Sequence, residues 1–449
     1  MKLFNNFWNI LDKKQKGLFF VLIFFSILQT IVEMIGIAVA IPFVTFLLQP
    51  ESLSEIKFLS NFIKLDEIII TDKLIFIFCL IFFSIFLIKN IIIVITNKFN
   101  YTFIFSCKVK LFKNLINKIL NQEYIFFVRR GISKIFNTTF NEVNTFTYHV
   151  VNPLIILFCE VLITFGILFL IILTGNIKGL ILIIPIVIII ALMLKKINQS
   201  IKTWANTRIR ENEKIIDYNL NLVNGIKEIL IFGKEKNLIN QFDNSLNSLK
   251  EVDINHNVVS AYPKVLLEQA VILIFILIIL ILSYFGTPNN NIIIILSFYL
   301  AAAYRLVPSI NRIFRSYQSI KYGKPSIPKI MEYYNLSTKN ILIENEKITE
   351  IFKFEKKIEL KNINFNYDIN IEIIKDLNLE INKNEIIGII GESGVGKSTV
   401  INLLTSLLKA EDGKIIVDGK EINNTIDFRR YKNLFSVSSQ DSYLLDGTI

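Results

Sequence analysis

The sequence is poor in charged residues, cysteine and histidine. Only 19% of its 449 residues are charged, whereas soluble domains usually carry about 25%. The cysteines Cys79, Cys107 and Cys159 are widely spaced, which excludes a disulfide framework and a CxxC metal site. The only histidines, His149 and His256, have no ligand-like neighbours. With 52% hydrophobic residues, these shortages exclude a disordered chain, a collagen-like chain and an ordinary soluble enzyme.

Long apolar runs are what the sequence has instead. A helix that crosses a bilayer needs about 20 apolar residues. Six runs are candidates, and they lie at 17–48, 74–96, 151–173, 179–194, 265–285 and 292–307. The first run is too long for a cleavable signal peptide and lacks a small-residue cleavage site. The pattern therefore predicts a polytopic α-helical membrane domain with six transmembrane helices.

The net charge of +11 gathers between these runs. Basic residues dominate the N-terminus and residues 97–149 and 195–264, whereas residues 46–72 are acidic. Because positive loops stay on the cytoplasmic side, both termini and the two long basic segments are expected there. Helical spacing within these segments predicts that the membrane helices extend into the cytoplasm. The basic residues flank the runs without interleaved stacking aromatics, which argues against a nucleic-acid partner.

The composition of the sequence changes after Tyr334. Residues 335–355 are polar, and strand-like patterns begin at Lys356. The predicted organisation is a transmembrane domain over 1–334, a linker over 335–355 and a partial α/β nucleotide-binding domain over 356–449.

Residues 391–398 read GESGVGKS and fit the phosphate-loop pattern GxxxxGK[ST]. An apolar segment, Glu385–Ile390, precedes the loop and is expected to be a strand, and a helix is expected over Ser398–Leu408. Lys397 is expected to reach the β- and γ-phosphates, and the hydroxyl of Ser398 to bind Mg²⁺. The predicted ATP-binding residues of this loop are Gly391, Glu392, Ser393, Gly394, Val395, Gly396, Lys397, Ser398 and Thr399.

Two residues outside the loop, Tyr367 and Gln440, also fit nucleotide chemistry, and a third, Asp418, imitates it. Tyr367 follows a predicted strand, where its ring can stack on adenine or simply pack. Gln440 follows the β-like Leu434–Ser436 and is either a ligand of Mg²⁺ and the attacking water or a polar residue at the surface. Asp418 ends an apolar strand as a Mg²⁺-binding Asp does, but Gly419 follows at once, and Asp-Gly predicts a hairpin turn instead.

Six spans followed by this loop resemble the ABC exporters with fused membrane and ATPase domains. In that resemblance GESGVGKST is the Walker A segment, Tyr367 the adenine-stacking residue and Gln440, within SSQD, the catalytic Q-loop residue. The resemblance implies ATP and Mg²⁺ as ligands, a homodimer, and coupling helices near 136–143 and 225–229. The signature segment, the Walker B strand and the switch histidine of that family follow the Q-loop. The chain is therefore expected to be a C-terminally truncated fragment that does not hydrolyse ATP by itself.

The membrane half is similar to bacterial lipid-linked oligosaccharide flippases. The similarity lies in EMIGIAVAIPFV at 33–44 and in residues 224–242 and 301–327. It implies a multi-pass protein of the bacterial cytoplasmic membrane that moves a lipid-linked glycan. Two alternatives stay open: an exporter of a peptide, a drug or lipid A, or a catalytically inactive membrane protein.

Charged residues within the apolar runs are costly and point to function or to pairing between helices. They are Glu33, Lys89, Glu160, Glu268 and Arg305. Arg305, Arg312 and Arg315 share one helix face by their spacing. Guanidinium groups bind phosphate by paired hydrogen bonds, so this line of arginines is predicted to hold a diphosphate head group.

Overall fold

The computed structural model describes residues 12–48, 72–173, 183–284, 289–337, 353–368, 371–423 and 425–438. The chain divides into two compact units. The first comprises Met1–Leu115 and Phe136–Glu332, and the second comprises Ile116–Ile135 and Tyr333–Ile449. The first unit is a bundle of helices, and the second contains a four-stranded sheet.

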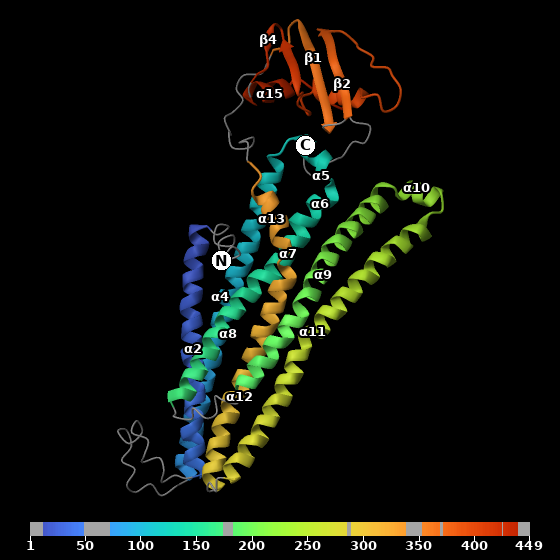
Figure 1. Ribbon diagram of the computed structural model, residues 1–449. Coiled ribbons are helices and arrows are strands. Elements are labelled where there is room, and N and C mark those ends of the chain that lie inside the picture. Colours follow the sequence, from blue (N-terminus) through green and yellow to red (C-terminus); the bar gives the residue numbers. More distant parts are fainter. Residues whose placement is uncertain are drawn as a thin grey trace. The chain divides into compact units, whose positions relative to one another are not determined.

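Long helices form the first unit (Figure 1). They are α2 (Lys13–Leu48), α4 (Asp72–Leu120), α8 (Asn152–Leu173), α9 (Ile183–Asn224), α11 (Glu235–Tyr284) and α12 (Asn289–Gly323). Each holds most or all of one apolar run that the sequence predicts as a span. The described stretches that are long and apolar enough to cross a membrane are Lys13–Gly36, Cys79–Leu120, Ile132–Ile172 and Glu235–Leu280. The chain is therefore a multi-pass membrane protein, as predicted.

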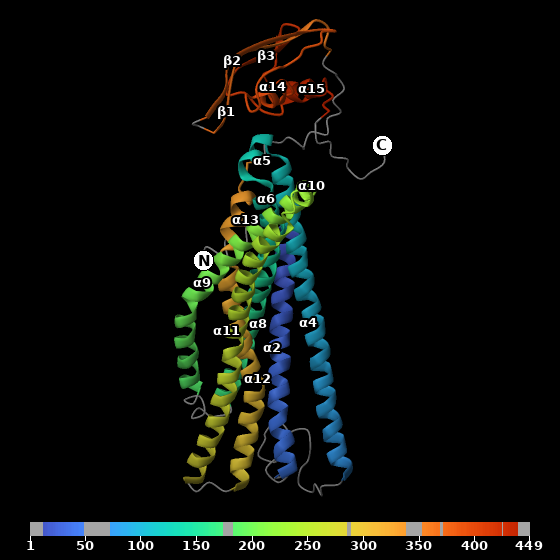
Figure 2. The same ribbon diagram turned by 90° about the vertical axis from the view of Figure 1, so that its right-hand side faces the viewer.

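Helices α9 and α11 lie side by side (Figures 1 and 2). They contain 42 and 50 residues, and the short helix α10 (Ile226–Ile231) connects them. At about 1.5 Å per residue, they are about 2 and about 2.5 times as long as a hydrocarbon core of about 30 Å is thick. Both helices therefore continue well past the thickness of a bilayer, as their helical spacing predicts.

Two π-helical turns interrupt the helical segment that leads into α8. The segment runs through α6 (Ile132–Phe136), η2 (Asn137–Glu142), α7 (Val143–Phe146) and η3 (Thr147–Val151). A π-turn adds a residue to the turn and so changes which side chains face the neighbouring helices. Here Glu142 and Thr145 are both buried and both reach Arg208 of α9.

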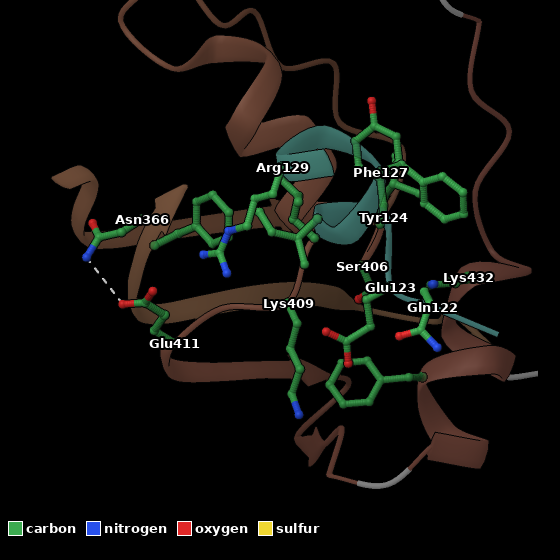
Figure 3. Close-up of a pocket in the computed structure, with 15 residues that line it drawn as sticks. Gln122, Glu123, Tyr124, Phe127, Arg129, Asn366, Ser406, Lys409, Glu411 and Lys432 are labelled. Carbon is green, nitrogen blue, oxygen red and sulfur yellow. Dashed lines mark hydrogen bonds between the residues drawn. The ribbon is translucent and has the colours of Figure 1, made fainter. Parts of the chain in front are cut away.

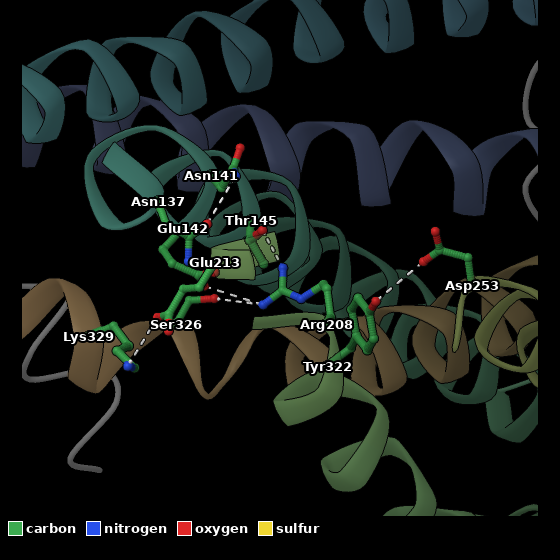
Figure 4. A network of polar contacts seen from close by, with 10 residues as sticks. All are labelled: Asn137, Asn141, Glu142, Thr145, Arg208, Glu213, Asp253, Tyr322, Ser326 and Lys329. Atoms are coloured by element: carbon green, nitrogen blue, oxygen red, sulfur yellow. Dashed lines mark hydrogen bonds and ion pairs between the residues drawn. The ribbon is translucent and has the colours of Figure 1, made fainter. Parts of the chain in front are cut away.

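Arg208 is the centre of a buried polar cluster (Figure 4). Its side chain pairs with Glu142 at 3.3 Å, and its guanidinium also donates to Thr145 and, at 3.2 Å, to Ser326 of α13 (Ser326–Tyr334). The guanidinium carbon lies 5.1 Å from the ring centre of Tyr322 in α12. Only 7% of Arg208 is exposed, and Glu142 is fully buried. One cation thus joins three separate parts of the chain, at residues 142–145, 208 and 322–326.

The second unit is built on an antiparallel sheet with the strand order β2-β1-β3-β4. The strands are β1 (Lys357–Asp368), β2 (Ile371–Asn382), β3 (Asp412–Val417) and β4 (Lys420–Glu421). Helices α14 (Lys397–Leu404) and α15 (Thr425–Lys432) lie on one face of it (Figure 2). Leu403 of α14 and Tyr431 of α15 close the core against Leu360 and Phe365 of β1.

One irregular position in β1 explains its burial pattern. Ile358 and Leu360 are buried, and so are Ile363 and Phe365, which breaks the two-residue alternation by one place. The pairing with β2 shifts between Leu360 and Ile363, where Asn362 has a φ of 51°. The extra residue keeps all four apolar side chains on the core face.

The expected strand Glu385–Ile390 is wrong, because these residues are not in a strand. Ile386 and Ile390 are 99% and 97% exposed. A buried strand needs hydrogen-bonding neighbours, and within the described residues no strand lies beside this segment. The helix after the loop also ends earlier than predicted, at Leu404, where a turn with Ser406 at a φ of 52° follows.

The predicted hairpin turn at Asp418 and Gly419 is confirmed. Both residues have positive φ, 51° and 85°, and they connect β3 to β4. This is the backbone geometry for which Asp-Gly is suited in a two-residue hairpin. The Asp418 carboxylate accepts hydrogen bonds from the backbone N–H groups of Glu355, Lys356 and Lys357 at 2.6–2.8 Å, and so fixes the start of β1.

Replacing Arg208 by alanine is expected to destabilise the first unit by about 3–5 kcal/mol, because Glu142 would stay buried without its partner. The measurement is thermal unfolding in nanodiscs, followed by the fluorescence of Trp204, which packs against the buried cluster that contains Tyr322. Arg210→Ala is the matched control, since Arg210 is an exposed residue of the same helix. An equal loss in both variants would contradict the central role of Arg208.

Asp418→Asn is expected to change how the stability of the second unit depends on pH. Partial burial raises the pKa of Asp418, but the three backbone N–H donors outweigh it and hold that pKa below its ordinary value. Asp418 therefore stabilises the fold above about pH 4, and this contribution is lost as the pH falls through the lowered pKa.

The measurement is urea unfolding at a series of pH values, with a Phe435→Trp reporter beside Tyr431. The wild type is expected to lose stability in acid more steeply than Asp418→Asn. Asp412→Asn, at the exposed start of β3, serves as the control and should follow the wild type. Parallel curves for wild type and Asp418→Asn would refute the role of this carboxylate.

Candidate nucleotide-binding site

The loop of residues 391–396 leads directly into α14. Gly394 has a φ of 86° and Gly396, the residue before the helix, a φ of 102°. A Cβ at Gly396 would lie 3.2 Å from side-chain atoms of both Ile373 and Ile374. Glycine is therefore required there twice, for the backbone angle and for the close approach to β2.

Lys397, at the end of the loop, is hydrogen-bonded to the start of the loop. Its ammonium donates to the carbonyl oxygens of Gly391 at 2.7 Å and Glu392 at 2.6 Å. The loop is exposed, and the first backbone N–H groups of α14 point out of the start of the helix, where its dipole is positive. A lysine, free backbone donors and a positive helix end at one exposed turn fit a chain of phosphates.

The two hydroxyl residues after Lys397 are placed differently. Ser398 is exposed beside the loop, whereas Thr399 is buried and its Oγ1 lies 3.4 Å from the hydroxyl of Tyr367. Ser398 is therefore the hydroxyl that suits a Mg²⁺ ion. Thr399 faces the interior and connects the helix to β1.

Tyr367 lies at the end of β1, and the structure brings it to the first turn of α14. Its ring contacts Phe365 edge-on, with ring centres 5.0 Å apart, and packs against the core. Its carbonyl oxygen accepts a hydrogen bond of 2.7 Å from Nε of Arg129. Stacking of this ring on adenine stays a prediction. Gln440 lies outside the described residues.

The sequence missed a short helix that packs on the sheet. Helix α5 (Tyr124–Arg130) belongs to the second unit, and Ile125 packs against the core of that unit. Side chains of α5, of β1 and of the segment after α14 line a cavity of about 510 Å³ (Figure 3). Two of its lining residues are joined there, since Asn366 donates to Glu411 at 3.2 Å. Gly131, with a φ of 76°, ends the helix and was the available sequence signal.

The coupling helices expected near 136–143 and 225–229 stay predictions. Residues Asn137–Glu142 form η2 inside the first unit, and Asn137 and Glu142 are fully buried there. Phe136 and Phe140 of the same segment, in contrast, are each 50% exposed. In the second segment, α10 begins at Ile226 and has no buried residues.

The charged residues of the apolar runs either line a cavity among the helices or lie at the exposed surface. Arg305 pairs with Glu33 through both guanidinium nitrogens that face it, and Arg312 lies 2.6 Å from Glu160. These residues line a cavity of about 390 Å³ together with Lys89. Arg315, predicted to act with the two arginines, is not in the lining and donates instead to the carbonyl of Ser260 at 3.4 Å. Glu268 is exposed and lies 3.8 Å from Lys264.

Comparison with known families matches both parts of the chain. Residues 14–304 match the family described as ABC transporter transmembrane region, and residues 374–449 match the family described as ABC transporter. The second match covers the phosphate loop and α14.

Individual relatives match shorter parts. ABC transporter B family member 29, chloroplastic, of Arabidopsis thaliana is 32% identical over 154 residues, which are 34% of this chain and 24% of the relative. Multidrug resistance protein 1 of Plasmodium falciparum (isolate 3D7) is 33% identical over 135 residues, 27% of this chain and 10% of the relative. The chain thus spans a quarter or less of the length of these two proteins.

A solved structure shares the fold. It is a bacterial Atm1-family ABC exporter with ATP bound, and it superimposes with a TM-score of 0.65 at 13% sequence identity. The likeness covers 92% of this chain and 69% of that one. The helical bundle followed by the sheet-containing unit is therefore the arrangement of a known fold.

Ser398→Ala is expected to remove most of the Mg²⁺ dependence of nucleotide binding, whereas the matched variant Thr399→Ala should keep it. The reason is the opposite placement of the two hydroxyls. Titration with a fluorescent ATP analogue, with and without Mg²⁺, measures both. Loss of one metal ligand is expected to weaken Mg²⁺-dependent binding about tenfold, or about 1.4 kcal/mol. The reverse pattern would assign the metal to Thr399.

Proposed function

Because the chain belongs to the ABC transporter family, we propose that it is a subunit of an ATP-driven exporter. One observation carries the proposal. A bundle of long apolar helices and a phosphate loop whose lysine is held by the carbonyls of Gly391 and Glu392 belong to one continuous chain. Binding of ATP in one part and passage of a cargo through the other is the function that this combination supports.

The residues of the loop divide the work of nucleotide binding. Backbone N–H groups of Gly394 to Ser398 hold the phosphates, Lys397 neutralises them, and Ser398 holds Mg²⁺. Tyr367 supports the adenine, and Gln440 supplies a further Mg²⁺ and water contact. In the whole transporter, hydrolysis of the bound ATP supplies the energy for transport.

We propose a homodimer on the basis of the tip formed by α10. This tip is rich in exposed apolar side chains, namely Val223, Ile226, Leu230, Ile231 and Phe232. Of the Phe232 residue, 70% is exposed. Apolar groups gathered on a small exposed helix mark a contact with a partner. A second copy of this chain is the partner we assign to it.

The proposed cargo is a lipid-linked glycan, moved across a bacterial cytoplasmic membrane with both chain termini on the cytoplasmic side. Arg305 and Arg312 support this cargo because they line a cavity among the membrane helices and are suited to a diphosphate. Arg315 extends the same helix face. The name of the Plasmodium relative favours a drug as the competing cargo.

Lys397→Ala is expected to weaken binding of ATP to the purified chain in nanodiscs at least about tenfold, because the ammonium that faces the phosphates is removed. Binding is followed with a fluorescent ATP analogue. Lys409→Ala is the control, since Lys409 is an exposed residue of the same unit outside the loop. Equal affinity of Lys397→Ala and wild type would end the proposal of an ATP site here.

The same preparation separates the cargoes. A lipid-linked glycan is expected to raise the melting temperature of the chain, and peptides, drugs and lipid A are not. If only a peptide, a drug or lipid A raises the melting temperature, the cargo belongs to that class of molecule instead.

A further inference from the structure

Glu33, Arg305, Glu160 and Arg312 form a chain of alternating charges among three helices. Glu33 of α2 is bound by Arg305 of α12 through Nε and, at 2.6 Å, through Nη2. Arg305 also lies 3.7 Å from Glu160 of α8. Glu160 lies 2.6 Å from Arg312, which is about two turns further along the same face of α12. These pairs attach α12 to α2 on one side and to α8 on the other.

The carboxylates are buried, and the cations face a cavity. Glu33 and Glu160 are both more than nine-tenths buried, whereas 45% of the Arg312 side chain is exposed. The cavity of about 390 Å³ also has the amide groups of Asn100 and Asn152 in its lining. Oε2 of Glu160 and Oδ1 of Asn100 have no hydrogen-bond partner. The polar groups in this cavity are therefore incompletely satisfied by one another.

Lys89 supplies a further positive charge in the same cavity. Its stem runs along α2, with Cδ 3.4 Å from the position of a Cβ on Gly36, one turn after Glu33. The Lys89 ammonium lies 4.8 Å from the ring centre of Phe86, and among the described residues it has no ion-pair partner. Three cations thus face two carboxylates, which leaves a surplus of one positive charge.

We infer that Glu33 and Glu160 are exchangeable partners of the two arginines, which give way when a phosphate-bearing anion enters the cavity. The inference rests on the proposed head-group role of Arg305 and Arg312 and adds to it the way in which binding is relayed. Phosphate oxygens replace the carboxylate oxygens on the guanidinium groups. Glu33 then turns to Lys89, so that α2 exchanges its link to α12 for one to α4.

The exchange is chemically balanced. A guanidinium group has a planar fork of N–H donors that fits a carboxylate and a phosphate alike, so one charge-assisted pair replaces another. The released Glu33 does not stay unpaired in a place of low polarity, because the Lys89 ammonium of α4 lies beside Gly36, one helix turn after Glu33. No proton or covalent bond moves.

The first test is binding of pyrophosphate to the full chain in phosphatidylcholine nanodiscs, measured by calorimetry. Glu33→Gln and Glu160→Gln keep the size of the side chain and remove its competing charge. Each is expected to bind pyrophosphate about tenfold more tightly than the wild type. Glu268→Gln is the control, since Glu268 is an exposed carboxylate of α11 that pairs with Lys264. It should bind like the wild type.

A second measurement uses the unaltered chain and so does not depend on the folding of a variant. Infrared difference spectra on addition of pyrophosphate are expected to show a change in the carboxylate stretching bands. This change should be reduced in either glutamine variant and retained in Glu268→Gln. Repeating the spectra in nanodiscs that contain phosphatidic acid, without pyrophosphate, distinguishes a lipid head group from a dissolved anion. The source that produces the carboxylate change is the one that the cavity takes.

Unchanged or weaker pyrophosphate binding in both glutamine variants, together with no carboxylate signal in the wild type with either source, would overturn the inference. Failure of the ATP site is a separate result. It would appear as unaltered ATP affinity in Lys397→Ala, which lies in the other unit and does not touch this cavity.

Discussion

Pairing of buried guanidinium and carboxylate groups is the interaction on which the helical unit depends. Apolar side chains gain little by leaving lipid for a helix interface, so packing alone gives long membrane helices little reason to choose one arrangement. Charges are different, because an unpaired one is expensive among apolar groups. Arg208 and Arg305 each collect partners from helices that are far apart in the sequence. They select the arrangement in which α2 and α8 meet α12 at Arg305, and α13 and the segment before α8 meet α9 at Arg208.

The sheet-containing unit depends on a different constraint, the need of each backbone donor for an acceptor. Where the sheet supplies no neighbour, side chains do so, and Asp418 receives three N–H groups at the start of β1. In the phosphate loop a side chain also serves the backbone, but there it is the donor. The Lys397 ammonium donates to two backbone carbonyls of its own loop. The nucleotide site is therefore shaped by local hydrogen bonding before any ligand arrives.

The features predicted well from the sequence are those that local pattern decides. Apolar runs located the six long helices, and the alternation in 358–367 and 373–381 located β1 and β2. The segment Glu385–Ile390 failed because a strand is defined by its neighbours, and an apolar run carries no information about them. The partners of Arg208 and Arg305 were beyond reach for the same reason. Spacing placed the arginines on a helix face, but only the packing of other helices shows that carboxylates lie opposite.

The pairing of α9 with α11 has a mechanical consequence. Beyond the point where Arg208 is anchored, α9 continues for about 25 Å to its end at Asn224, at about 1.5 Å per residue. The two helices brace each other over this length, so they form a stiff lever arm with its fulcrum at the buried cation. A tilt of about 10° at the fulcrum would carry α10 through an arc of about 4 Å. A small rearrangement deep in the bundle is thereby converted into a stroke at the tip that is large on the scale of a side chain.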